Sequence, residues 1–307
     1  MATKKAASTK KATVRKPAAA KTTVRTISAD AKTTKPTTSA AAEVSSRKPS
    51  RLPDNIVNVV FAELVGAFIL TLVALATFQD AGALYVGLAY GLLSMVLGAV
   101  SGSHLNPAVT FGLWTMRQLK TVMVPFYWGA QFLGALLAVV VTNWIANNSL
   151  SLNFDHLWTL NWAVFGSELV GTAVFMFGLA AVFNRRDLSG AVRASGVGVA
   201  LLVGLVAGGS LLATVKANDV ASYQAAAQQS SGSSPAIPHS AYVKGVSLNP
   251  AVALATPDHT ANELTTGSKS SKETVYSRFS SEVVLGTLVG AALGGNLYLL
   301  VAGRRKA

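Results

Sequence analysis

Two short stretches of this sequence are almost identical: "SHLNPAVT" at residues 103–110 and "VSLNPAVA" at residues 246–253. Each contains Leu-Asn-Pro-Ala-Val and lies in apolar sequence, where an asparagine is costly to bury unless its amide is hydrogen-bonded. Proline lacks an N–H and fits the first turn of a helix, and the asparagine before it is a good N-cap. Each stretch therefore predicts a loop that leads into the start of a helix.

The composition around these stretches is typical of a membrane protein. Apolar residues make up 51% of the 307 residues and charged residues only 13%, against about a quarter charged in soluble domains. Six apolar segments with few charges are long enough to cross a hydrocarbon core of about 30 Å as helices. They lie at about 56–78, 82–100, 124–146, 161–183, 193–215 and 280–302.

The apolar runs that follow the two motifs are too short to span. They are "VTFGLWTM" at 109–116 and "VALAT" at 252–256. Irregular backbone at membrane depth is tolerated only where it is buried in protein or lines a water-filled cavity. The sequence therefore predicts an all-α membrane protein with six transmembrane helices and two re-entrant half-helices.

The net charge of +13 is concentrated at the N-terminus. Residues 1–53 hold 13 of the 26 Lys and Arg residues, against Asp30 and Glu43 alone. This segment has almost no large apolar side chains, so we expect a disordered basic tail. Contact of the tail with anionic lipid is the favoured interpretation, and contact with nucleic acid is the alternative.

The short connections indicate the orientation. Basic residues occur in alternate connections, at Arg117 and Lys120 and at Arg185, Arg186 and Arg193, and again at the C-terminal end, 304–306. By the positive-inside rule, both termini are expected in the cytoplasm of a multi-pass protein of the cell membrane. The polar insert at about 216–245 then lies outside, as a lid over the outer mouth or as a tolerated surface loop.

An internal repeat divides the chain. "FAELVGAF" at 61–68 matches "GSELVGTA" at 166–173, which aligns Glu63 with Glu168. We expect a channel domain over 54–303, with a first half at 54–146 and a second half at 160–303. Because each half contains three spans, an odd number, the halves must be inverted relative to each other in the membrane.

Inversion makes the two half-helices meet N-terminus to N-terminus. Asn106 and Asn249 then offer amide donors at one place, beside two positive helix ends. Such a place holds the oxygen of a neutral molecule, repels cations and interrupts a chain of proton-conducting waters. The predicted pore residues are those of the two motifs: Asn106, Pro107, Ala108, Asn249, Pro250 and Ala251.

Taken together, the motifs resemble the aquaporin, or major intrinsic protein, family over about 50–303. The residues that carry the resemblance are "AELVG" with Glu63, "SGSHLNPAVT" at 101–110, "SELVGT" with Glu168, and "SLNPAV" at 247–252. The resemblance implies a homotetramer with one pore per subunit that passes water or small neutral solutes without cofactor, metal or catalysis. It also implies that both glutamates accept hydrogen bonds from loop N–H groups and that His104 has a structural or pore-wall role.

One departure from the family leaves the permeant open. The second motif of relatives continues with an arginine that forms the outer filter, and Val252 stands at that position here. The other filter positions map to Ser210, Val246 and Tyr90, although the spacing from Asn106 points to Val86, one helical turn before Tyr90. A wider filter favours a facilitator of glycerol, urea, ammonia or a metalloid acid as an alternative. A membrane-anchored scaffold that acts through its basic tail is the alternative from another class.

Overall fold

The computed structural model describes residues 52–77, 82–147, 153–229, 235–267 and 275–303. The predicted basic tail, except for its last two residues, and the basic residues at 304–306 lie outside this part of the chain. Among the described residues, six helices are long and apolar enough to cross a membrane. They are α1 (Ile56–Thr77), α2 (Gly82–Ser101), α4 (Val124–Ile145), α5 (Trp162–Phe183), α6 (Gly190–Gln229) and α10 (Ser281–Ala302).

Two short helices complete the predicted set. Pro107 and Pro250 are the first residues of α3 (Pro107–Thr115) and α8 (Pro250–Ala255), and both prolines are buried. The expected fold class, six spans with two half-helices, is therefore confirmed.

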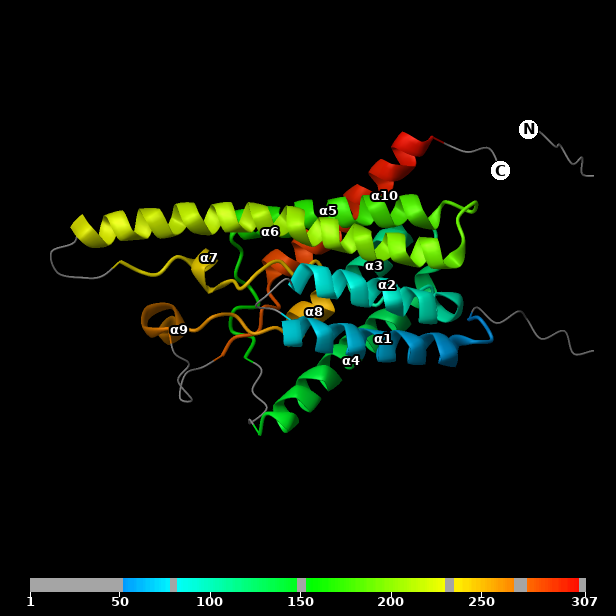
Figure 1. Ribbon diagram of the computed structural model, residues 1–307, viewed down its shortest axis with the longest axis horizontal. Coiled ribbons are helices and arrows are strands. Elements are labelled where there is room, and N and C mark those ends of the chain that lie inside the picture. Colours follow the sequence, from blue (N-terminus) through cyan, green and yellow to red (C-terminus); the bar gives the residue numbers. More distant parts are fainter. Residues whose placement is uncertain (1–51, 78–81, 148–152, 230–234, 268–274, 304–307) are drawn as a thin grey trace, which may run out of the picture. The chain divides into compact units, whose positions relative to one another are not determined.

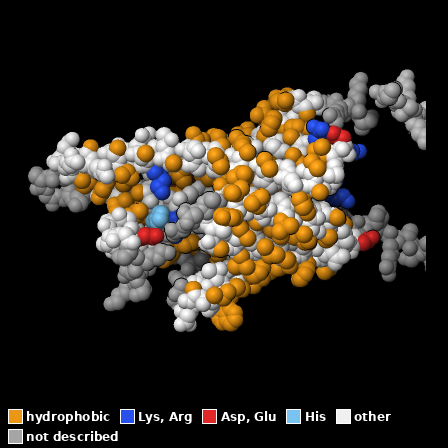
Figure 2. All heavy atoms as spheres, in the orientation of Figure 1, with side chains coloured by type: hydrophobic (Ala, Val, Ile, Leu, Met, Phe, Trp, Pro, Cys, Tyr) orange, Lys and Arg blue, Asp and Glu red, His pale blue; other side chains and the backbone are white. Residues whose placement is uncertain are grey.

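The outer surfaces of the long helices are apolar. On α2, for example, Leu88, Leu92 and Val96 are each more than 60% exposed. Figure 2 shows such hydrophobic side chains spread over the helices, with the charged groups at the two ends. An apolar surface of this extent suits contact with lipid chains, not water.

The helices of the two halves interlock. The pairs α1 with α4 and α5 with α10 correspond in the repeat, and α2 packs against α6 between them. At the α2–α6 crossing, a Cβ on Gly198 would lie only 2.4 Å from the carbonyl oxygen of Gly87. Small residues of this kind let membrane helices approach closely. Each half-helix also reaches the other half, because α3 contacts α10 and α8 contacts α4 and α1.

Helix α6 is longer than its apolar segment. Its 40 residues correspond to about 60 Å at 1.5 Å per residue, so it extends through the first part of the polar insert to Gln229. That part is rich in Ala and Gln, which favour helix. Figure 1 shows α6 extending toward α7 (His239–Tyr242) and α9 (Ala261–Thr266). We call the end of the spanning helices that carries α7 and α9 the loop end.

The extension of α6 is held by side-chain contacts at the loop end. Lys216 Nζ donates a hydrogen bond to the carbonyl oxygen of Val243 over 2.8 Å. Ser240 Oγ donates to Asp219 Oδ2 over 2.5 Å. These bonds fix α6 to the segment that leads into the second Asn-Pro-Ala motif.

Candidate functional site

The two asparagines cap the half-helices that follow them. Asn106 Oδ1 accepts a hydrogen bond from the N–H of Ala108 over 2.8 Å. Asn249 Oδ1 accepts from the N–H of Ala251 over 3.0 Å and of Val252 over 3.4 Å. Both asparagines have extended backbone conformations, as N-caps do.

The amide nitrogens of the same asparagines join the two motifs. Asn106 Nδ2 donates to the carbonyl oxygen of Leu248 over 2.8 Å, and Asn249 Nδ2 donates to that of Leu105 over 3.0 Å. An amide nitrogen carries two N–H groups, so each of these bonds uses one of the two. The motifs are thereby held against each other in a reciprocal pair.

Glu63 supports the loop before the first motif. Its Oε1 accepts from the N–H of His104 over 2.9 Å, and its Oε2 accepts from the N–H of Leu105 over 2.7 Å. Two neutral side chains add further donors, Ser101 Oγ over 2.6 Å and Gln131 Nε2 over 2.8 Å. A fully buried carboxylate is tolerated here because four donors surround it.

Glu168 does the same for the loop before the second motif. It accepts from the N–H groups of Ser247 and Leu248, each over 3.0 Å. Leu105 and Leu248 occupy equivalent positions in the two loops, each directly before the asparagine of its motif. Their φ values are +49° and +51°. A non-glycine residue in this left-handed region costs about 1–3 kcal/mol, so the glutamates hold the loops in a conformation that the backbone alone disfavours.

A small cavity lies between the motifs. Its volume is about 20 Å³, which by the usual minimum of about 10–15 Å³ per water accommodates roughly one water molecule. Both asparagines line it, and most of the other wall residues are apolar. The lining is Leu70, Val86, Tyr90, Asn106, Phe175, Leu201, Ser247, Asn249 and Val252.

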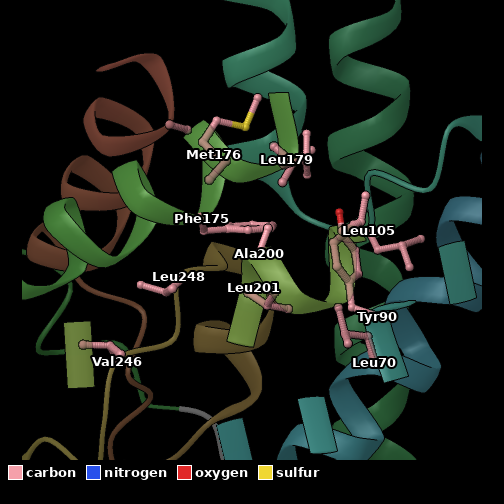
Figure 3. Packing of buried hydrophobic residues seen from close by; sticks show 14 of the residues in the cluster. Leu70, Tyr90, Leu105, Phe175, Met176, Leu179, Ala200, Leu201, Val246 and Leu248 are labelled. Carbon is pink, nitrogen blue, oxygen red and sulfur yellow. The ribbon is translucent and has the colours of Figure 1, made fainter. Parts of the chain in front are cut away.

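Three of the sequence-predicted filter positions meet at this cavity. Tyr90, Val86 and Val252 all line it, so both candidates on α2 are present, one turn apart. The Tyr90 ring packs edge-on against Phe175 at a centroid distance of 5.9 Å, and Figure 3 shows both in the cluster of buried hydrophobic residues. Its hydroxyl donates to the carbonyl oxygens of Ser103 (3.1 Å) and His104 (2.8 Å), in the loop before the first motif.

Two other predicted positions lie away from the cavity lining. Ser210 is exposed on α6, and its carbonyl oxygen accepts a bond from Thr214. Val246 is buried beside Gly208, and its neighbour Ser247 reaches the cavity instead. His104 packs on Tyr127 with ring centroids 4.3 Å apart and contacts Thr110 Oγ1 through Nδ1 over 3.1 Å.

Sequence reasoning missed four wall residues, Leu70, Phe175, Leu201 and Ser247. The internal repeat contained the signal for the first two. Leu70 and Phe175 each follow a repeat glutamate by seven residues, which places them on the same helical face as Glu63 and Glu168. No comparable pattern marks Leu201.

Comparisons with known proteins show what this chain is similar to. The sequence model of the family described as "Major intrinsic protein" matches residues 57–231. Aquaporin NIP2-3 of Zea mays is 30% identical over 52% of this chain and 58% of its own length. Aquaporin Z of Photorhabdus laumondii is 33% identical over 41% of this chain and 65% of its own. The chain thus matches less than two thirds of each of these relatives.

Among solved structures, this chain is similar to the aquaglyceroporin from Plasmodium falciparum. The superposition covers 81% of this chain and 96% of that chain, with 19% sequence identity and a TM-score of 0.48.

Proposed function

Because the chain belongs to the major intrinsic protein family, we propose that it forms a passive channel that conducts water down its gradient. The observation that supports this most directly is that Asn106 and Asn249 line one small cavity from the two halves of the chain. Catalysis, cofactors and metals have no part in the proposal.

In this proposal, the asparagine amides bind the oxygen of the permeant molecule. One N–H of each amide is used by the bond to the opposite loop, and the other is the donor that the permeant oxygen meets. A water that accepts two such bonds turns its hydrogens away from the donors, which interrupts proton transfer along the file. The apolar neighbours, among them Leu70 and Leu201, offer few competing partners.

A facilitator of small neutral solutes is the second candidate function. Val252 supports it, because it lines the cavity where the resembling family carries an arginine. The isopropyl group brings neither fixed charge nor donors to the wall. The cavity volume of about 20 Å³ favours water, since glycerol fits only when wall residues such as Tyr90 move.

We extend the proposal to assembly and location. The exposed apolar faces of the spanning helices suit lipid and neighbouring subunits, and we propose a homotetramer in the cell membrane with both termini in the cytoplasm. In this arrangement the loop end faces outward, and the basic tail meets anionic lipid at the inner surface.

Stopped-flow light scattering on proteoliposomes tests the function. Osmotic gradients of sucrose, glycerol and urea are applied to liposomes with and without the full chain. We expect water permeability well above that of empty liposomes, and a value equal to theirs contradicts the water channel. Deletion of residues 1–50 tests the scaffold alternative, because a channel retains its flux without the tail.

A further inference from the structure

A buried arginine lies beside the second motif, outside the cavity. Arg278, between α8 and α10, is 1% exposed. Its guanidinium faces three carboxylates: Nη1 is 2.6 Å from Glu282 Oε1, Nη2 is 3.6 Å from Glu168 Oε1, and Nε is 3.9 Å from Asp258 Oδ1. A buried cation is costly unless it is paired, so this position requires an explanation.

Arg278 contacts both ends of the second motif segment. At the start, its partner Glu168 is the carboxylate that accepts the N–H groups of Ser247 and Leu248. At the end, the backbone N–H of Arg278 donates to the carbonyl oxygen of Thr256, the C-cap of α8, over 2.8 Å. The segment that carries Asn249 and Val252 is therefore held between two contacts of one residue.

The same arginine connects this segment to the loop end. Glu282, its closest partner, accepts the N–H of Asn161, the N-cap of α5, over 2.9 Å. Its Oε1 also lies 3.0 Å from His239 Nε2, in α7. Arg278 thus joins α5, α8 and α10 with the segments that cover them.

In the first half of the chain, the repeat glutamate has different side-chain partners. There the repeat glutamate, Glu63, is bonded by the neutral side chains Ser101 and Gln131. A charged partner occurs beside Glu168, in the half whose motif ends in Val252. The difference between two otherwise matching halves indicates a task specific to the second one.

We propose that Arg278 is a positioning residue for the loop-end half of the pore: through Glu168 and Thr256 it fixes the motif segment that places Asn249 and Val252 on the cavity. The proposal rests on the channel function for its effect on flux. The bond to Thr256 belongs to the backbone, and the side chain acts through its carboxylate partners. A guanidinium suits these contacts because its donors point in several directions at once, whereas a lysine ammonium on a flexible stem does not bridge in this way.

Arg278→Lys tests the proposal because it keeps the positive charge of the side chain and removes the planar guanidinium with its several donors. Two measurements are made: hydrogen–deuterium exchange of residues 243–256 in detergent, and the ratio of glycerol to water permeability in proteoliposomes. We expect hydrogen–deuterium exchange in this segment to become about tenfold faster, while the exchange rates of α1 and α2 stay unchanged. We also expect the ratio of glycerol to water permeability to change. Arg185→Lys is the matched control, because Arg185 pairs with Asp187 at the surface, far along the chain from the motif, and it should alter neither measurement.

Unchanged exchange at 243–256 together with an unchanged permeability ratio in Arg278→Lys overturns the proposal. If that variant does not fold, the double variant Arg278→Gln/Glu282→Gln removes the cation with its closest carboxylate, and the same faster exchange is expected. Wild-type exchange in the double variant is equally decisive against the proposal. Failure of the channel function is distinguishable, because wild-type proteoliposomes would then match empty ones while the exchange measurement still tests Arg278.

Discussion

Asn106 and Asn249 each donate a side-chain hydrogen bond to the carbonyl oxygen of the leucine that precedes the other. Because each asparagine also caps its own half-helix, we expect a change at one motif to affect the other. The two motifs therefore act as one structural unit formed by residues more than 140 positions apart.

Asn106→Asp tests this reciprocity. Aspartate keeps the oxygen that caps α3 but loses the N–H that reaches Leu248 and the second N–H, which we propose binds the permeant. We expect water permeability per protein to fall about tenfold, which corresponds to about 1.4 kcal/mol and lies within the cost of an unmade buried bond. Asn249→Asp should give a similar loss in the same stopped-flow assay. A large effect at one asparagine only would contradict the paired arrangement.

Gly171→Ala tests the packing behind the second motif. A Cβ on Gly171 would lie 2.7 Å from a methyl group of Leu248 and 2.9 Å from the carbonyl oxygen of Gly204. Overpacking of this kind costs about 1–3 kcal/mol, so the thermal unfolding temperature in detergent should fall. Gly166→Ala, in the same helix, is the control because a Cβ there meets nothing within 4 Å. Equal unfolding temperatures for the two variants would contradict the prediction.

Local patterns in the sequence were sufficient for most of the fold. Apolar length predicted the spans, and the repeated motif with its proline predicted the two half-helices, because these features depend on neighbouring residues alone. The repeat also paired Glu63 with Glu168. The same offset of 105 residues that joins the two glutamates also pairs Leu70 with Phe175, both of which line the cavity.

Other parts of the site depend on contacts that a single sequence does not display. The face that a helical residue presents turns by about 100° per residue, and a single sequence does not show which face of α6 lies against the motifs. Ser210, the expected filter position on this helix, is exposed and is not part of the cavity lining. Arg278 stands in a polar stretch that reads as a surface loop. It is buried because α5, α8 and α10 pack together around it, and this packing between distant segments is not visible in the local sequence.

Asp258 predicts a pH dependence of stability. Burial raises the pKa of this carboxyl from its ordinary 3.8 to about 6, although the nearby Arg278 guanidinium acts to lower it. Because the folded-state pKa is above the unfolded one, the contribution to stability is fully present below about pH 4 and is lost as the pH rises through 6. Two pKa units correspond to about 3 kcal/mol at most.

Asp258→Asn isolates this contribution, since the amide does not titrate. Unfolding temperatures of both proteins are measured in detergent at pH 4, 5, 6 and 7. We expect the wild type to lose stability relative to the variant over this range. A difference between the two proteins that stays constant from pH 4 to 7 would show that Asp258 does not titrate there.

Tyr90 is expected to limit solute size. Its ring lines the cavity, and its hydroxyl is bonded to the loop before the first motif. Tyr90→Ala should raise glycerol permeability in proteoliposomes because it removes the bulk, whereas Tyr90→Phe keeps the ring and should leave glycerol excluded. Tyr85→Ala, at a position of the same helix that is 49% exposed, is the control. Glycerol flux that is unchanged in Tyr90→Ala would place the size limit elsewhere.

Val252→Arg introduces the residue that other members of the family have at this position. Val252 lines the cavity and is 5% exposed, so a guanidinium there adds a fixed positive charge where dielectric screening is weak. We expect lower proton and cation leak, measured with a pH-sensitive dye in proteoliposomes, and lower glycerol flux. Val252→Leu adds bulk without charge and separates the two effects: it should reduce glycerol flux but leave the leak at its wild-type value. A leak that Val252→Arg leaves unchanged would mean that the barrier to cations is the asparagine pair itself.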